Sequence, residues 1–547
     1  GNQRIADHVY TAFTRAMRNY ESQPASSRRF ELTDAMVWGE ITSDPSVLIS
    51  PGANPIQPIK ERDIVTMGGT GGRSRMTMTY HTRKFQKDEL GVVSGDTVDN
   101  GDVGIIAVKT ANPEFATIDG MTTPPDYSGF RPANMLSFIN GLAPDILLDD
   151  GKRRNFVGIQ MGSGTTFNEA YCTPYRTGVE MLVAHRTSSK HASVIDQPGK
   201  VTAVTNDHIE VKLEDGSTKA YPLGAWYGQY EGVTYPHRMV TQFKVGDKLP
   251  AKTVVAYNMD HFEPDLYNKY QVNWKNGRLA RVFLLVAEEV NEDSNAISDE
   301  FGSTTTCRTT KTKNVTLNAQ QNLIEILSEN TAVDTETILC TFSDDIGGSS
   351  DQLSAEAAAT LAALSQYTPR AGVHGILENI EVVYNGEIED MSPSLATFVR
   401  RYDTIRRRKA KALNRNDIPT DGHVDGDYRV DGIPLGYNQV LIRFSITYEH
   451  TLGPADKLVI ANQLKTTIQE RMVGKNTTED GRPGDLKFGR DSVDARITGS
   501  FEAIGSATEV SLRGAEIVDM ALHGDLEEAM KYVQLLRNTK RFSDVLA

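Results

Sequence analysis

The stretch VLIRFSITYEHTLGPADKL spans residues 440–458. Apolar and polar side chains alternate over its first half, which predicts a β-strand. Gly453-Pro454 then predicts a turn, because glycine and proline interrupt regular structure. The turn would present Lys457 at the end of the strand, and a second lysine, Lys465, follows shortly after it.

A third basic residue, Arg496, follows in the segment DARI of residues 494–497. Two ammonium groups and a guanidinium at one place suit a polyanion, such as a nucleoside triphosphate or a nucleic-acid backbone. Most lysines are solvated surface residues, so spacing alone leaves a plain surface role open for Lys457 and Lys465. The rest of the chain must decide between the two interpretations.

Length and composition are those of a globular protein with several domains. The chain has 547 residues, of which 39% are hydrophobic and 24% are charged, and this length exceeds what one core usually holds. A net charge of −14 argues against a protein that binds nucleic acid through its overall charge. A local channel stays open, since Arg400, Arg401 and residues 406–411 form a dense basic patch.

Cysteine content and apolar runs indicate the compartment. Cys172, Cys307 and Cys340 are far apart in the sequence, so neither a disulfide framework nor a zinc site is expected. The longest apolar run, residues 282–287, is too short to cross a bilayer, and no membrane partner is expected. A reducing, cytoplasmic setting fits both observations.

Periodicity along the chain predicts a multidomain, β-rich α+β protein. Helices are expected at 1–40, 315–370 (with the alanine-rich piece Ser354–Leu364), Ser394–Leu413 and the C-terminal tail. Short strands are expected at 201–204, 208–213, 254–257, 281–286 and 372–383. A glycine cluster followed by Arg73 and Arg75 lacks the Gly-Lys-Ser/Thr ending of a P-loop, so a flexible loop is expected there.

The stretch around Lys457 and Lys465 resembles the lysine-bearing segment of the β subunit of multisubunit RNA polymerases. Both lysines keep the family's spacing, and Arg496 in SVDARI (492–497) matches the arginine that faces the nucleotide. Upstream, GVHGILENI (372–380) resembles the strand that leads into the flap of that family.

Two segments near the N-terminus follow the order that the β subunit uses. Residues 60–75 resemble a loop region that ends in an arginine, here Arg75. GDTVDNGDVGII (95–106) resembles the fork segment, with Asp102 where the family has asparagine.

Two more segments lie between these and the lysines. Residues 156–180 resemble a stretch after which the family has an arginine that approaches the nucleoside triphosphate, and that arginine falls on Met181. In VAEEVNEDSNAIS (286–298), Glu292 and Asp293 fall on the family's acidic pair near the metal-bound triphosphate.

The resemblance implies a double-psi β-barrel core with a flap-like insertion and helical segments. The implied regions are a fork- and lobe-like region with the glycine-arginine loop (1–150), the first part of the barrel with connected strands (151–315), a flap-like insertion with the basic helix (316–437), the second part of the barrel with the lysine loop (438–512) and a helical tail (513–547).

It also implies roles for individual residues. Lys457 and Lys465 would neutralise phosphates of the RNA 3′ end and of the incoming nucleotide, while Arg496, Glu292 and Asp293 would line the triphosphate side. The nucleic-acid contacts would come from Arg73, Arg75, Asp102, Arg406 and Arg407.

The implied enzyme is an assembly. Catalytic Mg²⁺ would be held mainly by a β′-type subunit, and no metal is expected on this chain, since the near-match HVDGD (423–427) fits a turn better than a magnesium site. Expected partners are an N-terminal β-type subunit, β′-type subunits, DNA template, RNA product, nucleoside triphosphates and a promoter-specificity factor. A cellular β subunit is roughly twice as long as this chain. A β subunit that is divided into N- and C-terminal polypeptides resembles the RNA polymerases of giant bacteriophages. The expected location is therefore the host cytoplasm, with packaging in the virion as a further option.

Two alternatives stay open. A phage capsid or tail protein would also be long, acidic and β-rich, but would not need to gather Lys457, Lys465, Arg496, Glu292 and Asp293 in space. A stand-alone nucleotide hydrolase fits poorly, because neither a P-loop nor a dinucleotide fingerprint is present.

Overall fold

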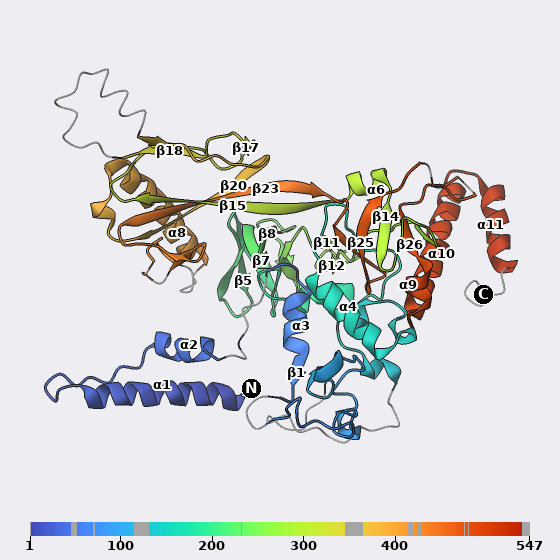
Figure 1. Cartoon of the computed structure of the whole chain (residues 1–547), viewed down its shortest axis with the longest axis horizontal. Helices are drawn as coiled ribbons and strands as arrows, with labels where there is room; N and C mark the ends of the chain where they lie inside the picture. Colours follow the sequence, from blue (N-terminus) through green and yellow to red (C-terminus); the bar gives the residue numbers. More distant parts are fainter. Residues whose placement is uncertain are drawn as a thin grey trace, which may run out of the picture.

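The computed structural model describes most of the chain, and Figure 1 shows its arrangement. The described residues are 2–44, 47, 52–68, 72–113, 131–230, 232–344, 365–413, 419–424, 426, 428–474, 476–479 and 481–538. Several sheets and helices make up this part, which confirms the β-rich α+β class. No helix in these ranges is both long and apolar enough to cross a membrane.

Helices mark both ends of the elongated molecule in Figure 1, and the N- and C-terminal helical predictions are confirmed. The helices are α1 (Asn2–Ser22), α2 (Asp34–Thr42), α3 (Gln57–Asp63), α4 (Gly151–Ser163), α5 (Glu180–Arg186), α6 (Asp299–Thr304), α8 (Pro393–Leu413), α9 (Arg490–Asp494), α10 (Gly499–Leu522) and α11 (Leu526–Asn538).

A long eight-stranded sheet runs through the middle of the molecule, in the order β17-β20-β23-β15-β8-β10-β3 with β7 on β8. Its strands are β3 (Ala192–Val194), β7 (Gly224–Tyr230), β8 (Val233–Val240), β10 (Val254–Asn258), β15 (Thr306–Asn318), β17 (Thr331–Val333), β20 (Gly375–Asn385) and β23 (Gln439–Thr451). β23 pairs with β15 along its whole length, so the strand predicted at 440–448 is confirmed.

The basic helix predicted at Ser394–Leu413 is also confirmed, as α8. Its apolar side chains, among them Leu395, Phe398 and Val399, share one core with Ile442 and Phe444 of β23. Each such buried side chain stabilises the fold by about 1.5–3 kcal/mol. The charged face of α8 therefore points away from the sheet.

The helix predicted over 315–370 is wrong in its described part. Residues 315–318 complete β15, and short strands follow: β16 (Asn322–Ile326), β18 (Cys340–Ser343) and β19 (Gln366–Tyr367) form a three-stranded sheet, while β17 joins the central sheet. The apolar residues here, including Leu317, Leu339 and Phe342, fill the core above α8 from strands. The piece Ser354–Leu364 lies outside the described residues.

A five-stranded sheet forms the other end of the body, in the order β13-β26-β14-β25-β24. Its strands are β13 (Val282–Leu285), β14 (Ser294–Ile297), β24 (Lys457–Ile460), β25 (Leu464–Arg471) and β26 (Leu486–Gly489). β13 pairs in parallel with β26, β14 pairs in parallel with β25, and β26 is also antiparallel to β14. Strands from two distant parts of the chain are thus interleaved, but the described path is open, and a double-psi barrel stays a prediction.

Smaller sheets complete the described part. A four-stranded sheet has the order β6-β5-β4-β9, and three pairs stand alone. These strands are β4 (Gly199–Val204), β5 (His208–Leu213), β6 (Thr218–Pro222) and β9 (Lys248–Leu249), then β1 (Ile64–Thr66) with β2 (Ile106–Val108), β11 (Phe262–Pro264) with β12 (Val272–Trp274), and β21 (Arg429–Val430) with β22 (Ile433–Pro434). The strands predicted at 201–204, 208–213, 254–257, 281–286 and 372–383 are confirmed as β4, β5, β10, β13 and β20.

Candidate polyanion-binding face

One face of the five-stranded sheet carries both predicted lysines. Lys457 of β24 lies opposite Thr467 of β25, and Val459 lies opposite Lys465. Residues that are directly opposite share a face of the sheet. The Cα atoms of diagonal neighbours such as Lys457 and Lys465 lie about 7–8 Å apart. Both lysines are exposed, because the alternate residues of β25 turn into the core.

Asp293 and Arg496 lie next to the same sheet, where β14 begins. The carbonyl of Asp293 accepts a hydrogen bond from the Thr467 N–H at 3.2 Å, which places Asp293 level with Lys457. The Arg496 guanidinium is 2.6 Å from one Asp293 carboxylate oxygen and donates to the other at 2.8 Å. The chain thus joins an arginine–carboxylate pair to two exposed ammonium groups.

Glu292 is held beside this pair by its backbone. Its φ of 49° lies in the left-handed region, which non-glycine residues adopt rarely and at a cost. Its carbonyl accepts a hydrogen bond from the Ser492 hydroxyl, while its side chain is exposed. Residues that carry such strain cluster at functional sites.

Arg153, which the sequence reasoning missed, comes close to this edge. Asp149 is buried, and its carboxylate accepts hydrogen bonds from the Ser500 N–H at 2.9 Å and from Gln463 Nε2 at 2.5 Å. This carboxylate ties the start of α4 to the turn between the lysine strands and to the start of α10. Burial lowers the pKa of Arg153, the nearby Arg496 lowers it further, and Asp293 acts in the opposite direction. Arg153 therefore lies within electrostatic reach of the pair.

A signal for Arg153 was present in the sequence. Residues 152–154 read KRR, one residue after Asp150, which caps α4 by accepting a hydrogen bond from the Arg153 N–H at 2.7 Å. Cations are unfavourable at a helix N-terminus, where the peptide dipoles already place positive charge. Three cations in that position indicate a purpose other than helix stability.

The glycine-arginine loop and residues 95–106 fold against each other. Arg73 donates to the Gly104 carbonyl at 2.8 Å, and Arg83 donates to the Val103 carbonyl at 2.7 Å. Arg75 and Asp102, both predicted nucleic-acid contacts, form an exposed ion pair at 2.5 Å. Exposed pairs contribute at most about 1 kcal/mol, so a phosphate could displace Asp102 from Arg75 at little cost.

Asp96, in the segment 95–106, gives a prediction that pH can test. It accepts hydrogen bonds from Ser137 and Asn140, and burial raises its pKa to about 6. The Asp96 carboxyl therefore binds its proton more tightly in the folded protein than in the unfolded chain. The stability that this difference contributes is lost as pH rises from about 4 to above 6. The unfolding free energy of wild type relative to Asp96→Asn should fall by about 1.4 kcal/mol between about pH 5 and pH 8. Urea unfolding across this range measures the difference, and a flat difference would contradict it.

The two predicted arginines of α8 differ in exposure. The Arg406 side chain is only 21% exposed and lies 3.9 Å from both Glu381 and Asp403. Arg407 is exposed, as are Arg401 and Arg408. Little of Arg406 remains for a nucleic acid, while Arg407 stays accessible on the outer face of the helix.

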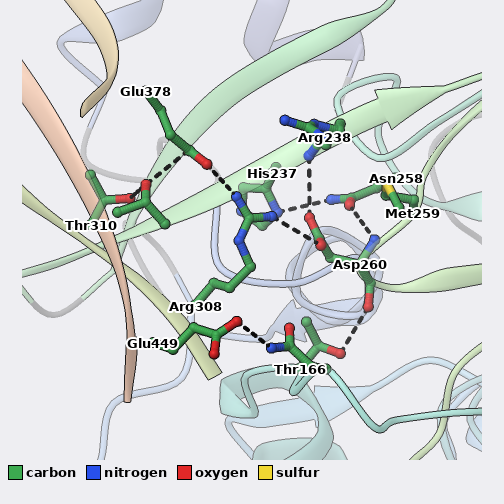
Figure 2. Close-up of polar contacts among 12 residues, drawn as sticks. Thr166, His237, Arg238, Asn258, Met259, Asp260, Arg308, Thr310, Glu378 and Glu449 are labelled. Carbon is green, nitrogen blue, oxygen red and sulfur yellow. Dashed lines mark hydrogen bonds and ion pairs between the residues drawn. The ribbon is translucent and has the colours of Figure 1, made fainter. Parts of the chain in front are cut away.

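A second polar cluster, shown in Figure 2, surrounds Arg308 of β15. Arg308 donates to Glu378 at 2.6 Å and lies 3.5 Å from Asp260. Glu378 also accepts from the Thr447 hydroxyl at 2.8 Å, and a cavity of about 160 Å³ lies beside Arg308, Asp260 and His237. No local pattern signalled this cluster, because its members come from separate strands.

Three buried histidines, His191, His237 and His261, pack against one another beside this cluster. Burial lowers the pKa of His237 to about 4 and lowers those of His191 and His261 well below the ordinary value. His237 accepts a hydrogen bond from Asn258 at 2.8 Å and donates its other N–H to the Gly52 carbonyl at 2.5 Å. His237 therefore links the central sheet to the segment at Gly52.

Neither a search for metal-ligand groups nor comparison with known sequences identifies the function of this site. Among the residues that the structure describes, no three or more His, Cys, Asp or Glu side chains are grouped as a metal site would need, and Asp425 and Asp427 of the HVDGD segment lie outside those residues. No protein-family model matches the chain, and no curated protein sequence matches it significantly.

Proposed function

We propose that the chain is a β-type subunit of a DNA-dependent RNA polymerase and carries its lysine-bearing, C-terminal part. The observation that carries the proposal is the arrangement around one sheet: Lys457 and Lys465 share an exposed face, and Thr467, which lies opposite Lys457, donates to the carbonyl of Asp293, which pairs with Arg496. These residues come from distant parts of the sequence. A capsid or tail protein has no need to gather them, so the convergence favours the polymerase over that alternative.

The chemistry of the face suits a triphosphate and an RNA 3′ end. In this enzyme class, Mg²⁺ held by a β′-type partner activates the 3′-hydroxyl and stabilises the pyrophosphate leaving group. Lys457 and Lys465 would contribute fixed positive charge to the phosphates, about one phosphate spacing apart. Fixed charge stabilises a transition state because it needs no reorganisation as negative charge develops.

Arg496 and Arg153 would act beside the lysines. The pairing with Asp293 holds the Arg496 guanidinium in one orientation, which suits the planar geometry of phosphate recognition. Met181 stands where the family has an arginine that approaches the nucleoside triphosphate. Arg153 would supply a cation from α4 in place of that arginine. Glu292 is exposed at the same edge and would face the metal-bound triphosphate.

The finer assignments belong to the same proposal. The interleaved parallel pairs β13–β26 and β14–β25 support a double-psi barrel, with 316–437 as a flap-like insertion. The folded loop around Arg73, Arg75 and Asp102 would contact the template and the RNA–DNA hybrid through their backbones. Arg407 would contact DNA or a promoter-specificity factor.

Affinity purification of the tagged chain from its native source tests the proposal. We expect it to co-purify with an N-terminal β-type chain and with a chain that bears the β′ motif Asp-x-Asp-Gly-Asp, and the eluate should synthesise RNA on a DNA template only with Mg²⁺. Recovery of the chain alone in large symmetric assemblies, with no RNA synthesis, would assign it to the phage structural proteins instead.

A further inference from the structure

A third lysine, Lys487, belongs to the same sheet but is buried. It lies opposite Ala296 of β14, while its neighbours Leu486 and Phe488 turn into the core. Side chains alternate between the faces of a strand, so Lys487 points to the side that carries Lys457 and Lys465. Only 10% of its side chain is exposed.

Lys487 forms an ion pair with Glu289. Its ammonium group donates to the two carboxylate oxygens at 3.2 and 3.3 Å. A buried ion pair is a weak source of stability, and an apolar residue of similar volume is often as good. The pair therefore calls for a reason other than the stability of the sheet.

That reason lies in the segment that Glu289 begins. Val290 is buried, the Glu292 carbonyl is bound by Ser492, and the Asp293 carbonyl is bound by Thr467. At Glu289, the Lys487 side chain of β26 binds this segment to the sheet. Four residues later, Asp293 binds Arg496.

We propose that Lys487 is a positioning residue: through Glu289 it fixes residues 287–293, so that Asp293 holds the Arg496 guanidinium in place. The inference rests on the proposed function for its catalytic consequence, but the mechanical link is a property of this chain alone. The link is contiguous, since every step from β26 to Arg496 is a described contact or a short piece of backbone.

Hydrogen exchange of the full chain tests the mechanical link without any activity. Lys487→Met keeps the length of the side chain and removes its charge, and it should speed exchange of the amides of 287–293 by about tenfold or more. The matched control is Lys212→Met, an exposed lysine on β5, which should leave these amides unchanged. Glu289→Gln weakens the pair from the more exposed side and should give the same local result if Lys487→Met folds poorly. Unchanged exchange in both variants would overturn the proposal.

Kinetics of the purified assembly test the catalytic consequence. Lys487→Met should raise the KM for nucleoside triphosphates by about fivefold or more with a smaller change in kcat, and Lys487→Arg should restore it. In an Asp293→Asn background the same substitution should have almost no further effect, because both act through one contact. The proposal would be overturned if the effects of Lys487→Met and Asp293→Asn on KM multiplied in the double variant. It would also be overturned if Lys487→Met sped hydrogen exchange but left KM unchanged, because Lys487 would then be a structural residue.

The two failures are distinguishable. If the assembly makes no RNA while exchange at 287–293 responds to Lys487→Met, the proposed function fails and the link to Asp293 stands. If RNA synthesis depends on Lys457 and Lys465 but exchange ignores Lys487, the function stands and the positioning role fails.

Discussion

Lys465→Ala and Lys457→Ala should each slow nucleotide addition by about 100-fold or more. Both lysines lie on one exposed face of the five-stranded sheet, as diagonal neighbours. Loss of either leaves phosphate charge without its fixed counter-charge in the transition state. Single-nucleotide incorporation by the purified assembly on a primed template measures the effect.

Stability provides the control for this prediction. Both lysines are exposed, and substitutions at such positions usually change stability by no more than about 0.5 kcal/mol. The variants should therefore assemble with their partners like wild type, and Lys212→Ala on β5 should retain normal elongation. Normal elongation by either lysine variant would remove the main support for a polymerase role.

Arg308→Met should destabilise the central sheet by about 3–5 kcal/mol. The substitution leaves Glu378 and Asp260 without their cation in an environment where their side chains are only 15% and 16% exposed. Neither carboxylate can regain full hydration there, so the loss exceeds that of the ion pair itself. Hydrogen exchange of the amides of β15 and β23 measures the change locally, which avoids assuming that the whole chain unfolds in one step.

Arg370→Met is the matched control. Arg370 pairs with Glu336 at 2.5 Å, but the two side chains are 52% and 76% exposed. Water replaces a lost partner there, and the expected cost is about 0–1 kcal/mol. Equal costs at Arg308 and Arg370 would mean that the cluster in Figure 2 is well hydrated and adds little to the fold.

Local patterns predicted local structure well. The alternation at 440–448 and the apolar stripe of Ser394–Leu413 each indicated the element that buries them, β23 and α8. The segment after Val315 misled because short apolar runs separated by polar residues fit a helix as well as strands. Its strand identity depends on a core shared with β23 and α8, which no short window of sequence contains.

Long-range placement was predicted only where the family resemblance supplied it. The resemblance assigned Asp293 and Arg496 to one site, and the structure pairs these two side chains, although nothing local to Asp293 indicates the pairing of β14 with β25. Arg153, Lys487 and Arg308 were missed because the residues they interact with are far from them in the sequence. Charge at a helix N-terminus and a lysine between core residues were the available signals.

The order of strands in the five-stranded sheet limits when the sheet can form during synthesis of the chain. β26 lies between β13 and β14, although it is synthesised after the whole of the central sheet's β15, β20 and β23. While the ribosome is still making the chain, β13 and β14 therefore have unpaired edges of the kind that bind other strands. The five-stranded sheet can be completed only after residue 489 has been synthesised, so an unfinished chain would need protection of these edges until then.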